Sequence, residues 1–279
     1  MKEKRFHFCH GDETTATLSS SCSSTTSLTV SIKEDLDHAA NDNYGCYTWI
    51  SAPVLAHYVW RHHHRINERH IIEIGAGPSL PGIVAGHCGA ASLTLADSRV
   101  FHPAALKLAR KNAELNGLTS ARVIDVTWGL VGPEMKDSPT YDVVLASDCF
   151  YDARQFEEVV FTIATLLQKC SETNVKQQQQ QLQHRPERQQ RHEQPEQEKT
   201  SNRLSKAPAE VWMSYQERSS GRSIRHFLSK YRLRCVEEIC WDDFYDSASS
   251  EKERQSLNHL NEHHQIRSVW ILIIRRDDY

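Results

Sequence analysis

The sequence contains no apolar stretch as long as the ~18 residues that would span a bilayer. Residues 1–10 also lack the apolar segment that a secretory signal requires. There is no excess of basic residues, since the formal net charge is −3. A clustered basic face is typical of nucleic-acid-binding proteins. We therefore expect no membrane-spanning segment, no secretion signal and no direct partner among nucleic acids or membranes.

Cysteines at the spacing of redox or metal-binding pairs are absent as well. The eight cysteines are scattered singly, and no CxxC pair occurs. Several lie inside apolar runs, which favours buried free thiols in a reducing compartment. The expectation is an intracellular protein without a metal site.

Three segments have too few large apolar residues to contribute to a core. Residues 11–31 are rich in Ser and Thr, and we expect residues 1–40 to form a disordered tail with one strand near residues 28–32. Residues 171–207 form a glutamine-rich, low-complexity insert that should loop out at the surface. Residues 242–267 are also polar and should form a second excursion.

The remaining sequence, residues 41–170 and 208–279, is long enough for one substantial core and is predicted to form one domain. Within it, apolar patterns typical of strands and helices alternate. The predicted strands are residues 71–74, 92–96, 122–126, 142–146, 210–215, 234–239 and 268–274. The predicted helices are one that Ser51 caps and those over residues 80–88, 103–116, 153–168 and 221–231.

Strands separated by helices indicate an α/β fold with a seven-stranded, mostly parallel sheet and helices on both faces. No helical pattern separates the last two strands, so we expect them to pair antiparallel at one edge, with the last strand antiparallel to the others. A sheet of this Rossmann-like kind binds its ligands beyond the carboxyl ends of the strands.

A glycine-rich turn follows the first predicted strand of this sheet, in "IIEIGAGPSLPG". After Gly75 and Gly77, the third glycine, Gly82, comes too late for the dinucleotide fingerprint, and no Lys-Ser or Lys-Thr pair follows as in a phosphate-binding loop. The turn can still bring bare main chain close to a ligand. Glu73, inside the strand, either faces a positively charged ligand or anchors the turn through backbone N–H groups.

Asp97 ends the second strand, about 20 residues beyond Gly77, where a carboxylate can accept hydrogen bonds from both hydroxyls of a ribose. This spacing favours a nucleoside ligand without the pyrophosphate of a dinucleotide. The alternative is that the glycines only punctuate a loop and that Asp97 caps a helix.

The motif "EIGAGPSLPG" with its acidic partner resembles the seven-strand S-adenosylmethionine-dependent methyltransferases. Three further stretches, "YGCYTWISAPVLAHYVW", "VTWG" and "LASDCFYD", narrow the resemblance to the family-16 protein methyltransferases and, within them, to the histone-arginine methyltransferases. The resemblance covers about residues 41–170 and 208–276. It implies S-adenosyl-L-methionine as cofactor, a protein substrate, methylation of arginine on histone H3, and a location in nucleus and cytoplasm.

Position by position, the resemblance implies cofactor contacts from the glycine turn, from Asp97 at the ribose and from side chains of three other motifs. The implied cofactor-binding residues are Trp49, Glu73, Gly75, Ala76, Gly77, Asp97, Trp128 and Ser147. Indole rings suit the flat face of an adenine and the charge of a sulfonium. Both tryptophans could instead be core aromatics, and Ser147 a strand-end cap.

For catalysis we expect Asp148 to orient the acceptor nitrogen and Tyr151 to shape its channel, because both follow the fourth strand directly. Asp148 could otherwise be a helix cap and Tyr151 only a packing residue. Methyl transfer needs no covalent nucleophile, so neither Cys46 nor Cys149 is expected to act as one. The run His62-His63-His64 resembles a metal signature, but successive helical residues point apart, and we interpret it as a solvated helix end.

Other functions remain open at this level. A protein lysine methyltransferase with a non-histone partner shares the same chemistry. A nucleotide-dependent oxidoreductase is disfavoured by the late third glycine. A non-catalytic cofactor-binding scaffold would keep the fold and use the glutamine-rich insert for association.

Overall fold

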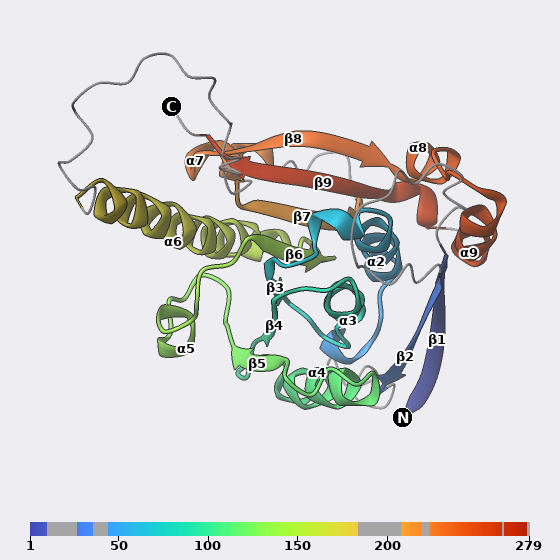
Figure 1. The fold of residues 1–279 in the computed structure, drawn as a ribbon. Coiled ribbons are helices and arrows are strands. Elements are labelled where there is room, and N and C mark those ends of the chain that lie inside the picture. The colour runs from blue at the N-terminus through green and yellow to red at the C-terminus, as the bar shows by residue number, and fades with distance from the viewer. Residues whose placement is uncertain (10–26, 36–43, 184–207, 219–223, 264, 278–279) are drawn as a thin grey trace, which may run out of the picture.

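A computed structural model of the chain describes residues 1–9, 27–35, 44–183, 208–218, 224–263 and 265–277. Seven strands form one mixed sheet in the order β5-β4-β3-β6-β7-β9-β8 (Figure 1). The strands are β3 (His70–Ile74), β4 (Ser92–Asp97), β5 (Arg122–Asp125), β6 (Val143–Ser147), β7 (Glu210–Gln216), β8 (Leu233–Cys240) and β9 (Val269–Arg276). Neighbouring strands from β5 to β7 run parallel, whereas β9 is antiparallel to both β7 and β8. The predicted α/β fold with an antiparallel last strand is confirmed.

Strand β3, inside the sheet, carries isoleucines on both faces, as a strand covered by helices on both sides should. Ile71 points into one core and Ile72 and Ile74 into the other, and all three are fully buried. The first core lies under α2 (Ser51–Arg61), α3 (Leu80–His87) and α4 (Pro103–Leu115), and the second under α6 (Phe156–Gln183) and α7 (Arg225–Lys230).

The N-terminal region differs from the predicted disordered tail of residues 1–40. β1 (Lys2–Cys9) and β2 (Ser27–Glu34) pair antiparallel as a separate two-stranded sheet. Phe8 and Ile32 are fully buried, so the pair contributes to the first core. In Figure 1 it lies beside α4 and α9 (Glu251–Asn261). The single strand expected near residues 28–32 is present as β2, and residues 10–26 and 36–43 lie outside the described part.

β2 is also tied to the helix beside it. The side-chain amide of Asn112, on α4, accepts a hydrogen bond from the Lys33 backbone and donates to the carbonyls of Lys33 and Pro78. Pro78 belongs to the glycine turn after β3. The N-terminal strand pair is therefore linked, through one buried amide, to the loop at the carboxyl edge of the sheet.

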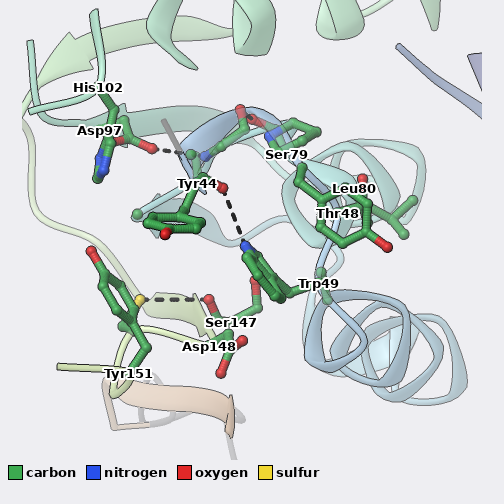
Figure 2. A pocket seen from close by; sticks show the side chains of 18 of the residues that line it. Tyr44, Thr48, Trp49, Ser79, Leu80, Asp97, His102, Ser147, Asp148 and Tyr151 are labelled. Atoms are coloured by element: carbon green, nitrogen blue, oxygen red, sulfur yellow. Dashed lines mark hydrogen bonds and ion pairs between the residues drawn. The ribbon is translucent and has the colours of Figure 1, made fainter. Parts of the chain in front are cut away.

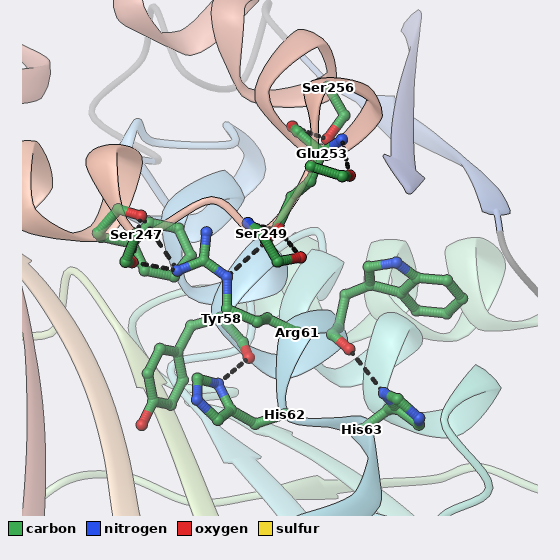
Figure 3. Close-up of polar contacts among 11 residues, drawn as sticks. Tyr58, Arg61, His62, His63, Ser247, Ser249, Glu253 and Ser256 are labelled. Atoms are coloured by element: carbon green, nitrogen blue, oxygen red, sulfur yellow. Dashed lines mark hydrogen bonds and ion pairs between the residues drawn. The ribbon is translucent and has the colours of Figure 1, made fainter. Parts of the chain in front are cut away.

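The polar excursion expected at residues 242–267 is instead largely helical. α8 (Trp241–Asp246) and α9 lie between β8 and β9, and the side chain of Ser250 caps α9 by accepting from the Glu253 N–H at 3.2 Å. Figure 3 shows Arg61, at the end of α2, reaching this region. Its Nε lies 2.5 Å from a Glu253 carboxylate oxygen, and its Nη1 donates to Phe244 and Ser247. These contacts fasten α8 and α9 to α2.

Smaller differences concern helix ends. α6 begins after a short 3-10 turn (Ala153–Gln155) and continues beyond residue 168 into the predicted insert, of which residues 184–207 lie outside the described part. A short helix, α5 (Pro133–Lys136), was not predicted. Ser51 is the first helical residue of α2 and makes no cap, because the N-cap position is Ile50. No helix within the described residues is long and apolar enough to cross a membrane.

Candidate active site

A cavity of about 230 Å³ opens at the carboxyl ends of β3, β4 and β6. A second cavity, of about 400 Å³, adjoins it, and both are bordered by Asp97, His102, Trp128 and Tyr151. In Figure 2, Asp97 and His102 lie on one side of the view and Ser147 and Asp148 on the other. Every candidate site residue from the sequence lines the first cavity except Glu73.

The glycine turn presents bare main chain to this cavity. Gly75 and Gly77 have φ values of +57° and +49°, in the left-handed region of backbone conformation that residues with a Cβ rarely adopt. A Cβ on Gly75 would lie 2.9 Å from the Trp128 ring, and one on Gly77 would lie 2.9 Å from the Gly45 carbonyl oxygen. Both glycines are therefore required by backbone conformation and by close neighbours, and they are not simple loop punctuation.

Asp97 is held rigidly at the end of β4. One carboxylate oxygen accepts from the Gly77 N–H at 2.8 Å, and the other accepts from the Ser98 N–H at 2.7 Å and lies 3.2 Å from the His102 ring. The residue is 4% exposed. A carboxylate has about four acceptor positions, so some remain for ligand hydroxyls. The helix-cap alternative is wrong, because His102 occupies the N-cap of α4.

Glu73 does not line the cavity, and its predicted cofactor contact is corrected. Its carboxylate is fully buried below the turn, where one oxygen accepts from the Gly82 N–H at 3.0 Å. Burial raises the pKa of Glu73 well above its ordinary value. A Cβ on Gly82 would come within 2.5 Å of the same carboxylate. Of the two roles considered for Glu73, the structure supports the one in which its carboxylate anchors the turn through a backbone N–H. Glu73 holds the start of α3, and a glycine is needed at position 82 because a Cβ there would collide with the carboxylate.

The aromatic side chains predicted at the site line the cavity, and Trp128, which is partly buried, also packs against the second core. Trp49 is 37% exposed, packs edge-on against Tyr47 at 5.1 Å, and donates its ring N–H to the Tyr44 carbonyl at 3.2 Å. Trp128 covers Gly75 and lies 6.1 Å from the Tyr151 ring, measured between centroids. Flat apolar faces therefore border the cavity at its Trp49 end and at its junction with the second cavity.

The residues after β6 form the opposite wall. Asp148 has a φ of +54° and donates its backbone N–H to the Ser214 carbonyl. Both of its carboxylate oxygens accept hydrogen bonds from Arg218, at 3.0 and 2.7 Å. Asp148 caps no helix, because Asp152 holds the N-cap of the following turn. The predicted acceptor-orienting carboxylate thus carries a partner that sequence reasoning did not anticipate.

Tyr151 borders both cavities and is 40% exposed. Burial of its hydroxyl, with a smaller contribution from nearby acidic groups, raises the pKa of Tyr151 to about 12. The phenol therefore stays protonated at neutral pH. It can donate a hydrogen bond or wall a channel, but it is unsuited to act as a base there.

The thiols near the site are inert. Burial raises the pKa of Cys149 well above its ordinary value, and it raises that of Cys46 to about 11. A neutral thiol is a poor nucleophile. This agrees with the expectation that neither cysteine forms a covalent bond to substrate.

The histidine run at the end of α2 is only partly as expected. His64 is exposed, but His62 packs its ring 4.1 Å from that of Tyr58, and burial lowers the pKa of His62 to about 4. The interpretation as a solvated helix end is therefore wrong for His62. Among the described residues, no group of three or more His, Cys, Asp or Glu side chains is placed to hold a metal ion.

Several cavity residues were not singled out from the sequence. They are Tyr44, Tyr47, Thr48, Ser79, His102 and Arg218. Most stand within the motifs "YGCYTW" and "GPSLPG" already noted, and Arg218 stands in "YQERS" (residues 215–219), which matches the same family. A systematic extension of each motif to its polar and aromatic neighbours would have found all except His102, which follows Asp97 at the start of α4.

A family model described as lysine methyltransferase matches residues 25–194. Histone-arginine methyltransferase METTL23 of Xenopus laevis is 32% identical over 196 residues, which cover 70% of this chain and 68% of that protein. Protein-lysine methyltransferase METTL21E of Mus musculus is 29% identical over 138 residues, covering 48% of this chain and 55% of that protein. A solved magnesium protoporphyrin IX methyltransferase from Synechocystis with bound SAH is 13% identical with a TM-score of 0.44, covering 81% of this chain and 82% of that one.

Proposed function

The chain belongs to the family-16 methyltransferases, with S-adenosylmethionine as cofactor, and on this premise we propose that it methylates arginine side chains of a protein substrate, histone H3 in particular. The observation that carries the proposal is the shared cavity. The Gly75–Gly77 turn and Asp97 line one side of this cavity, and the buried carboxylate of Asp148 lines the other.

The residues present fit the cofactor. Asp97 is fixed by the turn and has acceptor positions left for ribose hydroxyls, and the absence of a Cβ at Gly75 and Gly77 lets a ligand approach the main chain. Trp128 offers a flat face where the two cavities meet, which suits an adenine, and Trp49 offers another for the methionine end. Ser147 borders the same space from the end of β6. When bound, the cofactor supplies a methyl group already activated on a sulfonium sulfur.

The chain's own task is then alignment of the acceptor. A guanidinium stays protonated at any physiological pH, so it needs a carboxylate to orient it and offset its charge. Asp148 is a buried carboxylate on the cavity wall, and Tyr151, a neutral phenol, stands beside it. The similarity to METTL23 supports arginine as the acceptor.

A lysine acceptor is the second candidate, and the description of the family model and the similarity to METTL21E favour it. A lysine must lose its proton before it can accept a methyl group, which a base or a desolvated pocket would promote. Tyr151 is unsuited as that base, and burial keeps Cys149 neutral. With Asp97 assigned to the ribose, Asp148 is the carboxylate of the described lining that can orient a guanidinium, and this favours arginine.

The test is mass spectrometry of core histones after incubation with the full chain and cofactor that carries a deuterated methyl group. The expected result is label on arginine of histone H3, absent when Asp97→Ala replaces the wild type. Label confined to lysine would overturn the arginine assignment. Cofactor binding without label on any protein would instead favour a scaffold. We extend the proposal to a location in both nucleus and cytoplasm, which imaging of a tagged chain would check.

A further inference from the structure

Arg218 stands at a junction between the candidate active site and a smaller cavity beside it. It lines the first cavity, and with Tyr151 it also borders a small hollow formed by Phe150, Phe156, Tyr215, Gln216, Glu217 and Ile224. Asp148 lines the first cavity and not the hollow, so Arg218 reaches from the edge of the hollow to a carboxylate inside the candidate site.

The pair has the geometry of arginine recognition. Two parallel N–H groups of Arg218 donate to the two oxygens of Asp148, at 3.0 and 2.7 Å. This forked arrangement is specific to guanidinium, since a lysine ammonium binds a carboxylate as a point charge. The Asp148 carboxylate, with its left-handed backbone fixed by the Ser214 carbonyl, is thus already built as a guanidinium site.

The two partners differ in their access to solvent. The side chain of Asp148 is 5% exposed, whereas that of Arg218 is 37% exposed. A buried carboxylate without a cation is strongly destabilising, so Asp148 requires a partner at all times. Arg218 can turn outward into water, and Asp148 cannot. If a substrate arginine replaced Arg218, the Asp148 carboxylate would keep a guanidinium partner throughout.

We propose that Arg218 occupies the place of the acceptor on Asp148 and is a gate that the substrate arginine displaces. The inference rests on the proposed arginine methylation. It makes Arg218 a specificity-determining residue, because an incoming arginine restores both hydrogen bonds and a lysine restores only part of them. Glu217, exposed next to Arg218 in the sequence, adds a negative charge that suits a cationic side chain.

The test uses methylguanidinium as a probe with the full chain and its Arg218→Ala variant. Methylguanidinium is expected to raise the melting temperature of Arg218→Ala by about 4 °C and to leave that of the wild type unchanged. Only in the variant is the guanidinium position on Asp148 free to bind the probe. Arg154→Ala is the matched control: Arg154 donates from Nε and Nη2 to the two oxygens of Asp152, but its side chain is 90% exposed. The probe should not stabilise this control variant. Equal or no stabilisation of the two variants would overturn the inference.

Kinetics provides a readout that a purely structural role would not move. If Arg218 competes with the acceptor, KM for an arginine peptide falls at least about fivefold in Arg218→Lys, while kcat is retained. A large fall in kcat at constant KM would show instead that Arg218 only holds Asp148, and would overturn the gate. Arg218→Lys also keeps a charge beside Asp148 should Arg218→Ala fail to fold.

The probe assay keeps the two proposals separable. Stabilisation of Arg218→Ala by methylguanidinium together with no arginine methylation by the wild type would overturn the proposed function but support the guanidinium site on Asp148. Arginine methylation without stabilisation of the variant would overturn the gate alone.

Discussion

Substitution of Gly77 by alanine separates the backbone requirement of the turn from its role in the cavity. Alanine in the left-handed region costs roughly 1–2 kcal/mol. Gly117, which follows α4, has a φ of +78° with nothing within 4 Å of an added Cβ, so Gly117→Ala should suffer this cost alone. In Gly77→Ala the same cost applies, and the new Cβ also lies 2.9 Å from the Gly45 carbonyl oxygen. The segment that carries Gly45 must move away from the turn.

Two assays read the difference. At about 2–4 °C per kcal/mol, the strain lowers the melting temperature of both variants by several degrees. Calorimetric titration with S-adenosylhomocysteine should show at least about a tenfold loss of affinity, roughly 1.4 kcal/mol, for Gly77→Ala only. Gly117→Ala should bind as the wild type does. If both variants bound this ligand within about twofold of each other, the close approach of the turn to the ligand would be refuted.

Three further predictions follow from single side chains. Asp97→Ala should weaken binding of S-adenosylhomocysteine at least about tenfold in calorimetry. Asp125, which pairs with Asp97 on the neighbouring strand but lines neither cavity, is the control, and Asp125→Ala should leave the affinity unchanged. Equal losses of affinity in the two variants would contradict the role assigned to Asp97. Because burial raises the pKa of Tyr151 to about 12, kcat should show no loss from its ionisation between about pH 7 and 10, and Tyr151→Phe should keep this flat profile in a methyl-transfer assay. Burial and the neighbouring His259 hold the pKa of His57 well below its ordinary value, so the unfolded state takes up the proton first and stability falls as pH drops below about 6.5. Urea unfolding should show a loss of up to about 2 kcal/mol between about pH 7 and 5, with a shallower slope in His57→Leu, and an unchanged slope would contradict the assignment.

The sheet could be predicted from the sequence because its strands carry unambiguous patterns. Ile71, Ile72 and Ile74 are apolar and are buried on either face of the sheet. Gly89 and Gly117, both with positive φ, follow the ends of α3 and α4 and terminate these helices. Strand and helix boundaries were therefore close to those observed. The antiparallel pairing of the last two strands was also predicted, but its premise was wrong, because the helices α8 and α9 lie between β8 and β9.

The first N-terminal strand, β1, and the helices near residue 250 were missed because each buries few side chains, whereas β2 was expected near residues 28–32. β1 alternates charged residues with Phe6 and Phe8, and its strand character depends on pairing with a partner across a Ser-rich segment. α9 buries Leu257 and Leu260, three residues apart, within an otherwise polar sequence. A local signal existed, since Ser250 followed three residues later by glutamate is a capping box. Tertiary packing, rather than composition, decides these segments.

The candidate site was predictable where a motif fixes the main chain and less so where partners meet across the fold. Asp97 and the glycine turn follow from their place at strand ends, and the structure brings them together. Glu73 was ambiguous because a carboxylate inside a strand can face either a ligand or the turn. Arg218 could not be paired with Asp148 from the sequence, since the contact forms only when β7 lies beside β6.

The most direct test of the account is a crystal structure of the full chain with S-adenosylhomocysteine. The account predicts both ribose hydroxyls within about 3.2 Å of the Asp97 carboxylate and the ligand's main-chain contacts on Gly75 and Gly77. A ligand bound with its ribose elsewhere, or seated away from this turn, would contradict it.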